Sequence, residues 1–188
     1  MIRVVVLDHH PATCAGVNAI LREHSGVVPV GAAADRRALW PLLYRADPDV
    51  VVVDDLRVCL AVRARQPQAR VVLHLANAGF AMIVPAAFAG AHALVDKTCS
   101  PAELVAAIRG ETGLPIITPR LQRHAAAQLG GTDRAILAMR LAGTPDREIA
   151  EVVGLEPRAM TARNAAIIDV LSGRAVAALD RAGELHAG

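Results

Sequence analysis

Three charged residues stand at the ends of short apolar runs and are the candidates for chemistry. Asp8 ends the run IRVVVLD, Asp54 ends VVVVD, and Lys97 follows ALVD. Lys97 is also the single lysine of the sequence, beside nineteen arginines. One interpretation is that Asp54 and Asp55 are solvated residues that simply end a strand. No Ser/His/Asp or Cys/His spacing supports a nucleophilic enzyme, so we expect no enzymatic activity.

His9 and His10, next to Asp8, suggest a second kind of site. Imidazole nitrogens suit transition metals such as Zn²⁺ and Ni²⁺. Adjacent residues in a loop seldom converge on one ion, however, and the other histidines are scattered along the chain. The sequence therefore favours no metal site here.

Composition limits the class of protein that can position these residues. The 188 residues are 54% apolar and 20% charged, which is enough for one large or two small folded domains and excludes global disorder. Only 2% are aromatic, which argues against binding by stacking bases or sugars on aromatic platforms. Three cysteines without a CxxC pair, and no signal peptide in the first residues, predict a cytoplasmic chain.

Residues 71–95 contain no Asp, Glu, Lys or Arg and are long enough on paper to span a bilayer. Histidines, glycines and a proline interrupt this segment. We therefore interpret it as strand, helix and strand, and expect no association with a membrane.

The first part of the chain alternates between strand-like and helix-like segments. Continuous β-branched runs fit strands that are covered on both faces, as in a parallel sheet. Five alternations predict a doubly wound α/β domain over residues 1–110, with a five-stranded parallel sheet. The helix after Ser100 is the best marked, because Ser100, Pro101 and Glu103 match a capping box with proline at the first helical position. The predicted strands are 2–8, 27–32, 50–54, 71–76 and 93–96, and the predicted helices are 11–24, 35–46, 56–65, 79–89 and 100–110.

The second part of the chain has only helical spacing. Residues 111–119 predict a linker, and residues 120–188 a small all-α domain. Thr132-Asp133 and Thr144-Pro145 are predicted to cap two helices, and Glu156-Pro157 to begin a third. A fourth helix is expected over about 174–183, after Gly173. Two helices joined by a short turn at Gly154 predict a helix-turn-helix, whose later helix enters the major groove of DNA.

In this order, the sequence contains VVVLDHHPATCAGV, PDVVVVD, GAHALVDKTCSPAELVAAIRG and LAGTPDREIAEVVGLEPRAMTAR. These segments resemble response regulators of the NarL/LuxR (FixJ) type, and the resemblance extends over nearly the whole chain. The resemblance implies a flavodoxin-like receiver domain followed by a LuxR-type helix-turn-helix. It identifies Asp54 as the phosphoacceptor, Lys97 as the lysine that pairs with the phosphate, and Asp8 as the first acid of the pair that holds Mg²⁺.

Several positions of the receiver pattern are changed in this sequence. The second acid of the pair is replaced by His9, which is a poor substitute for an oxygen ligand of Mg²⁺. The hydroxyl position falls on Leu75 or Ala76, and the aromatic switch position falls on Leu94. We therefore expect an atypical receiver that works without phosphorylation and binds no cofactor, with Mg²⁺ itself in doubt.

The segment 79–89 suggests another source of signal. It carries Phe80, Met82, Ile83 and Phe88 and no charged residue. Exposed apolar surface of this kind is typical of a partner interface or a ligand groove. Because the resembling family often dimerises through this region, we interpret it as a dimer contact or effector site.

The DNA-binding prediction depends on one stretch of the second part. Residues 111–188 contain nine arginines and nine acids, whereas DNA-binding domains are normally basic. Residues 157–168, however, contain no acid, and they offer Arg158, Thr161, Arg163 and Asn164 for contacts to phosphates or base edges.

Together these observations predict a cytoplasmic, DNA-binding transcription regulator that acts as a homodimer. Its receiver would respond to dimerisation, a small-molecule effector or a protein partner. Two alternatives stay open: a phosphorylation-dependent two-component regulator, and a heterodimerisation partner of a related regulator that does not itself bind DNA.

Overall fold

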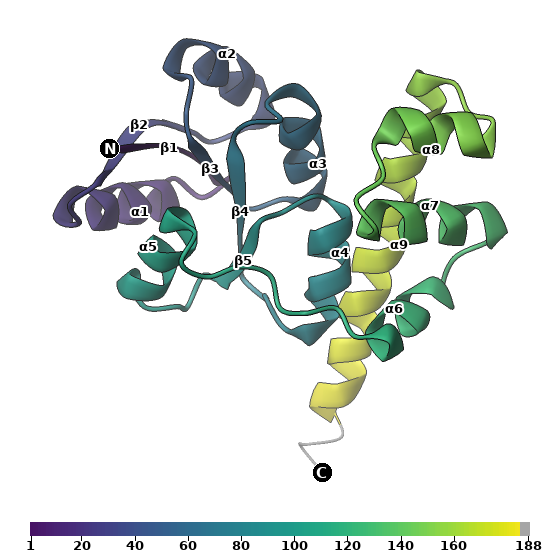
Figure 1. The fold of residues 1–188 in the computed structure, drawn as a ribbon. Helices are drawn as coiled ribbons and strands as arrows, with labels where there is room; N and C mark the ends of the chain where they lie inside the picture. The colour runs from purple at the N-terminus through teal and green to yellow at the C-terminus, as the bar shows by residue number, and fades with distance from the viewer. Residues whose placement is uncertain (185–188) are drawn as a thin grey trace. The chain divides into compact units, whose positions relative to one another are not determined.

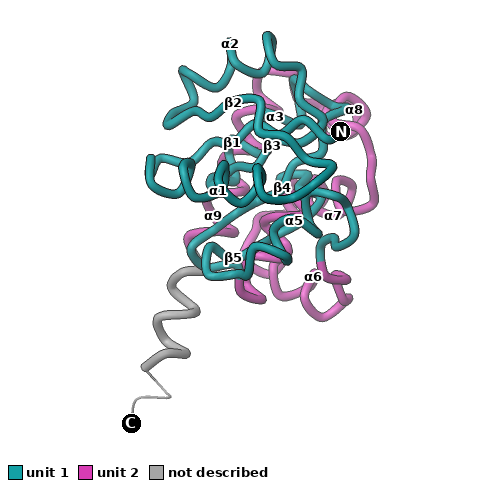
Figure 2. Tube along the Cα trace, turned by 90° about the vertical axis from the view of Figure 1, so that its left-hand side faces the viewer, with its two compact units in different colours: residues 1–78, 89–114 teal, residues 79–88, 115–188 magenta. Residues whose placement is uncertain are grey.

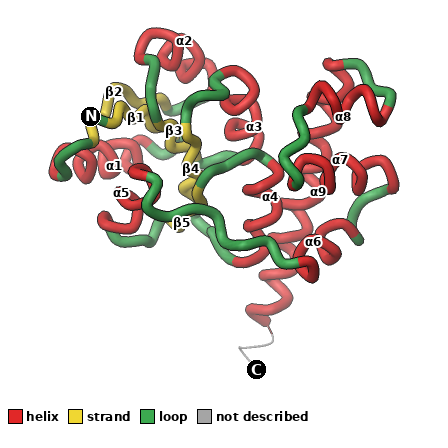
Figure 3. The backbone as a smooth tube through the Cα atoms, in the orientation of Figure 1, coloured by secondary structure: helices red, strands yellow, loops and turns green. Residues whose placement is uncertain are grey.

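The computed structural model describes the backbone of residues 1–184 and the side chains of residues 1–173. The chain forms two compact units, residues 1–78 with 89–114, and residues 79–88 with the chain from 115 onward (Figure 2). Within the described residues, all strands belong to the first unit, and the second is helical (Figure 3). No helix among these residues is long and apolar enough to cross a membrane.

The first unit is built on a five-stranded parallel sheet with the strand order β2-β1-β3-β4-β5 (Figure 1). This arrangement and the helical second unit confirm the predicted fold class. The predicted strands all form, within one residue at each end. They are β1 (Ile2–Leu7), β2 (Val27–Ala33), β3 (Val50–Val53), β4 (Arg70–Leu75) and β5 (Ala93–Asp96).

Helices cover both faces of this sheet, which explains its continuous valine runs. Residues that alternate along β1 and β3, such as Val4 and Val50, form one core cluster with the inner faces of α1 and α5. Their neighbours Val5 and Val51 are fully buried too, and α2 and α3 pack on the strands from the other side. Burial on both faces requires apolar residues at every position of a strand. The helices are α1 (Pro11–Glu23), α2 (Arg36–Ala46), α3 (Leu56–Arg65) and α5 (Pro101–Arg109).

Side-chain caps fix where these helices begin. The Asp55 carboxylate accepts a hydrogen bond of 2.7 Å from the Val58 N–H and thereby caps α3. Ser100 and Glu103 form the predicted capping box of α5. Because Asp55 is used as a cap, Asp54 is the carboxylate of this pair that is left for a site.

The second unit contains the remaining helices. Gly154 has φ 68°, the left-handed conformation that glycine adopts most easily, and it caps the end of one helix. Two residues separate Gly154 from the start of the next helix at Pro157. Ile136, Ile149 and Ile167 are buried where the helices pack. The helices are the 3-10 turn η1 (Phe80–Met82), α4 (Ile83–Phe88), α6 (Pro119–Ala126), α7 (Gly131–Leu141), α8 (Asp146–Val153) and α9 (Pro157–Glu184).

Two local predictions for this unit are wrong. Thr132 and Asp133 lie inside the first turn of α7, whose N-cap is Gly130. Gly173 does not separate two helices, since α9 is continuous from Pro157 to Glu184. A lone glycine costs a helix about 1 kcal/mol, which is too little to end it without a proline or a competing cap.

The apolar segment around α4 is mostly covered within its own unit. Met82, Ile83 and Phe88 are at most 7% exposed, because α4 packs against α6, α7 and α9. Phe80 alone of the four predicted side chains is 70% exposed. This corrects the prediction of a broad apolar contact surface. The apolar side chains of α4 pack against later helices of the same unit instead of remaining exposed.

Candidate functional site

The candidate site lies at the carboxyl edge of the sheet, where parallel strands bring together residues far apart in the sequence. Leu7 of β1 pairs with Val53 of β3, so Asp8 and Asp54 leave adjacent strands side by side. Lys97 follows β5, and its N–H donates to the Leu75 carbonyl at the end of β4. This edge is the usual position of ligand sites in open parallel sheets.

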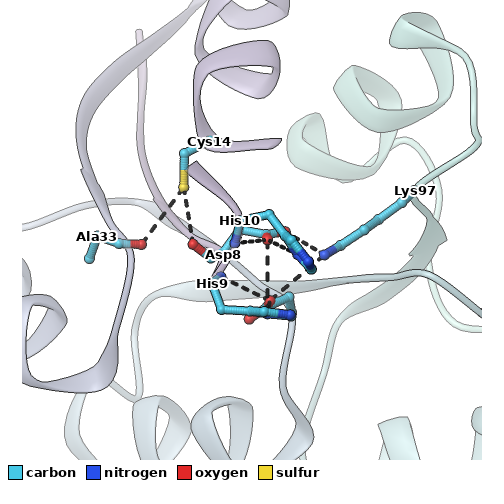
Figure 4. A network of polar contacts seen from close by, with 7 residues as sticks. Asp8, His9, His10, Cys14, Ala33 and Lys97 are labelled. Atoms are coloured by element: carbon cyan, nitrogen blue, oxygen red, sulfur yellow. Dashed lines mark hydrogen bonds and ion pairs between the residues drawn. The ribbon is translucent and has the colours of Figure 1, made fainter. Parts of the chain in front are cut away.

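The Lys97 ammonium group lies between the two carboxylates. Its Nζ is 2.6 Å from Asp8 Oδ2 and 3.7 Å from Asp54 Oδ2. Figure 4 shows the side chain extending from its strand toward Asp8. Burial alone would raise the pKa of Asp8, but the hydrogen bond from Lys97 and that from the His10 backbone outweigh it, and the pKa lies below its ordinary value. The structure therefore brings Asp8, Asp54 and Lys97 together as an ion-pair cluster.

His9 covers the carboxylate of Asp54. Its backbone N–H donates a hydrogen bond of 3.1 Å to Asp54 Oδ2, and its ring Nδ1 is in close contact with the same oxygen. As a result the Asp54 side chain is only 4% exposed, while the His9 side chain is 67% exposed. The backbone and ring of His9 thus both lie against this oxygen.

His10 and Cys14 complete the network and were not among the predicted site residues. The His10 N–H donates to Asp8 Oδ1 over 2.9 Å. The Cys14 thiol lies within hydrogen-bond distance of the Asp8 and Ala33 carbonyls and ties the end of β1 to β2 (Figure 4). Burial raises the pKa of Cys14, so this thiol has a structural role. The sequence signal for His10 was its place two residues after Asp8, whereas nothing local marked Cys14.

The residues present do not fit Mg²⁺. This ion requires close to octahedral coordination by oxygen, and here a third donor next to the two carboxylates is the His9 imidazole. The Lys97 ammonium group is already paired with both carboxylates. None of residues 76–79, directly after β4, has a hydroxyl group. The nearby Thr98 hydroxyl donates a hydrogen bond of 2.6 Å to Asp96 and is therefore already used.

The four predicted DNA-contacting residues all lie in the first part of α9, with different surroundings. Arg158 and Thr161 are exposed, although the Thr161 hydroxyl donates to the Pro157 carbonyl over 3.1 Å. The guanidinium group of Arg163 makes a two-point contact with the carboxylate of Asp133 on α7. No local sequence pattern indicated this pair, because the partners are separated by 30 residues.

Asn164 does not lie on the exposed face of α9, and this corrects its assignment as a base-reading residue. Its side chain is 1% exposed, and its Nδ2 donates to Asp146 Oδ2 over 3.3 Å. The Asn164 Oδ1 atom is buried without a hydrogen-bond partner. Asp146 also contacts Arg140, whose Nε donates to the Phe88 carbonyl over 3.0 Å. Asn164 thus belongs to the interior packing of the second unit.

Comparisons with known proteins define the class. A scan against models of known protein families finds no match. Among solved structures, the receiver domain of the putative response regulator NarL from Mycobacterium tuberculosis is 33% identical with a TM-score of 0.53, over 57% of this chain and 93% of that one. A LuxR-family two-component response regulator from Aurantimonas sp. SI85-9A1 is 26% identical with a TM-score of 0.54, over 65% of this chain and 94% of that one. The chain belongs to the response regulators.

Two further proteins are similar over most of their length. The transcriptional regulatory protein MctR of Rhizobium johnstonii is 25% identical over 170 residues, which are 82% of this chain and 79% of that protein. The RcsB response regulator of Salmonella typhimurium has a TM-score of 0.55 over 91% of this chain and 92% of that one. At 17% identity this second likeness shows the shared fold alone.

Proposed function

We propose that this chain is a DNA-binding transcription regulator whose receiver unit works without phosphorylation of Asp54. The observation that carries the proposal is the state of the Asp54 carboxylate. It is 4% exposed, contacted by the backbone and ring of His9, and placed 3.7 Å from Lys97. The carboxylate is therefore already paired, and the hydroxyl that binds a transferred phosphate in other receivers has no counterpart after β4.

Phosphoryl transfer to an aspartate depends on a metal ion and donors that neutralise the developing charge. Here Lys97 supplies one positive charge, and the third donor of the metal site is an imidazole. We therefore expect no measurable mass gain when the full chain is incubated with acetyl phosphate and Mg²⁺ and its intact mass is measured.

A matched variant makes that measurement decisive. The His9→Asp variant has a second acid next to Asp8 and serves as the positive control. Phosphorylation of this variant would show that the assay detects a competent site. A mass gain of one phosphate in the unchanged chain, lost in Asp54→Ala, would establish the alternative of a phosphorylation-dependent regulator.

The DNA-binding part of the proposal is supported by the relatives and by the α8–Gly154–α9 arrangement. Solved structures of RcsB bound to promoter DNA are among the structural neighbours. In this chain, Arg158 and Thr161 are exposed at the start of α9, where a helix-turn-helix contacts DNA. A dimer that reads two half-sites about one helical turn apart is the expected mode, because a single module makes few contacts. A gel shift against the DNA upstream of its own gene, repeated at rising salt, tests this.

The second candidate, a heterodimerisation partner that does not bind DNA, is favoured by one observation. Asp133 engages Arg163, and Asn164 is buried, so two of the four predicted DNA contacts are occupied within the chain. Failure of the gel shift at low salt with a broad pool of DNA sequences would favour this candidate. In that case native mass spectrometry of mixtures with related regulators becomes the informative measurement.

A further inference from the structure

The loop after β1 gathers three metal-binding side chains. A carboxylate oxygen of Asp8 and a ring nitrogen from each of His9 and His10 all lie within 4.8 Å of one another. The adjacent residues therefore do converge, contrary to the expectation from their sequence spacing. The backbone hydrogen bonds of His9 to Asp54 and of His10 to Asp8 hold the loop in this conformation.

The spacing of the donor atoms is close to that of a coordination shell. Zinc bonds to nitrogen and oxygen are about 2.1 Å long, so tetrahedral ligands are about 3.4 Å apart. His10 Nδ1 lies 3.4 Å from Asp8 Oδ1, and His9 Nδ1 lies 4.0 Å from the same oxygen. His9 Nδ1 contacts Asp54 Oδ2, so this ring must turn away from Asp54 to bind an ion. Three protein ligands leave the fourth position of a tetrahedral shell to water, as in open zinc sites.

Charge and access are also compatible with a cation. Asp8 and Asp54 carry two negative charges, and Lys97 carries one positive charge, which leaves the cluster negative. Lys97 forms its ion pair with Oδ2 of Asp8, whereas both histidine rings lie near Oδ1. Lys97 therefore does not occupy the oxygen that would bind the ion. The His9 and His10 side chains are 67% and 63% exposed, so an ion can reach them from solvent.

The donor set determines which ion is favoured. Imidazole nitrogens with carboxylate oxygens suit Zn²⁺, Ni²⁺ and Cu²⁺, whereas Mg²⁺ and Ca²⁺ require oxygen. We propose that Asp8, His9 and His10 form a site for one divalent transition-metal ion of the zinc type in place of the Mg²⁺ site of the family. This inference does not rest on DNA binding, and its failure would leave the proposed function unchanged.

The test is metal binding by the full chain after treatment with a chelator. Titration with Co²⁺, followed by its visible absorption, reports nitrogen and oxygen coordination directly. Calorimetry with Zn²⁺ gives the stoichiometry. We expect one equivalent of Zn²⁺ to bind, millimolar Mg²⁺ not to displace it, and His9→Asn and His10→Asn each to weaken binding at least ~10-fold.

His124→Asn is the matched control, because His124 is an exposed histidine of the second unit. Its Zn²⁺ affinity should equal that of the unchanged chain, and circular dichroism checks that every variant is folded. His9→Asp provides an independent readout, because exchanging nitrogen for oxygen should shift the preference toward Mg²⁺. Absence of Co²⁺ absorption, or Zn²⁺ binding that survives both His9→Asn and His10→Asn, overturns the proposal. Such surviving binding would point to the cysteines.

Discussion

At the scale of single residues, Lys97 determines the state of the candidate site. Its ammonium group compensates two carboxylates whose side chains are 2% and 4% exposed. Removing one partner of a buried ion pair leaves uncompensated charge in a medium of low polarity, which costs more than the pair itself contributes. We therefore expect the pairing of Lys97 with these carboxylates to contribute to the stability of the folded chain.

Replacing Lys97 by methionine tests this requirement. We expect Lys97→Met to lower the free energy of unfolding by about 3 kcal/mol, measured by urea denaturation in the presence of a chelator. The double variant Lys97→Met/Asp8→Asn removes one negative charge as well and should recover a large part of the loss. Equal stability of Lys97→Met and the unchanged chain would show that the carboxylates are compensated by other groups.

Two histidines predict how stability depends on pH, His74, which is buried, and His92, which is partly buried. Burial lowers the pKa of His74 and of His92, in each case helped by nearby cations. The Val71 N–H also donates to His92 Nδ1 over 3.0 Å, which requires that nitrogen to be unprotonated. Below the ordinary histidine pKa of 6.5, the unfolded chain therefore takes up protons that the folded chain excludes.

The free energy of unfolding should accordingly fall as the pH is lowered from 7.5 to 5.5, by up to about 1.4 kcal/mol per pH unit for each proton. The double variant His74→Gln/His92→Gln should show a flatter profile in urea denaturation over this range. Parallel profiles for the two proteins would contradict the role of these histidines. The matched control for the loss of imidazole groups is His124→Gln, which replaces an exposed histidine of the second unit.

At the scale of elements, the helix α9 has one exposed face and one buried face, and Asn164 lies on the buried face. A buried amide oxygen without a partner destabilises a fold, and an apolar residue of similar size removes that penalty. Asn164→Leu should therefore leave the free energy of unfolding unchanged or raise it by about 1 kcal/mol. Its affinity for DNA in a gel shift should stay within about twofold of the unchanged chain, which corresponds to less than about 0.5 kcal/mol.

Arg158→Ala is the comparison for Asn164→Leu, because Arg158 is exposed on the same helix. We expect this variant to weaken DNA binding and to reduce its salt dependence, as the loss of a phosphate contact does. A large loss of affinity in Asn164→Leu with normal stability would restore Asn164 as a DNA-contacting residue.

Elements were easier to predict from this sequence than contacts between them. The valine runs and the Ser100 capping box define strands and α5 through local physics, and these predictions were confirmed. The burial of Asn164 and the pairing of Arg163 with Asp133 depend on how α7, α8 and α9 pack, which no spacing within α9 specifies. The ends of the apolar runs marked Asp8, Asp54 and Lys97 as candidates, but only the family resemblance predicted that the three side chains lie together.

At the scale of the whole molecule, the compact units do not follow the order of the sequence. In the sequence, residues 79–88 stand between β4 and β5 of the first unit. In the structure they pack with the helices that follow residue 115. The domains predicted from the sequence, 1–110 and 120–188, assign this segment to the first. A cut in the linker would therefore remove α4 from the helices that bury it.

A fragment of residues 1–114 tests this consequence. It should expose Met82, Ile83 and Phe88, bind the dye ANS, and unfold at a lower urea concentration than the first unit of the full chain. Replacing Ile83 by Ser in the fragment should reduce the dye binding. A fragment that is silent toward ANS and as stable as the full chain would show that α4 has sufficient cover within residues 1–114.

The single lysine also makes the site a unique target for a protease. An enzyme that cleaves only after lysine has one possible cut in this sequence, between Lys97 and Thr98. The Lys97 side chain is 17% exposed and paired with Asp8, and the next residues form a turn held by Asp96. Cleavage therefore requires this turn to open, so the appearance of one new pair of fragments measures the opening of the site directly. A metal ion, an effector or a partner that closes the site should slow that cut.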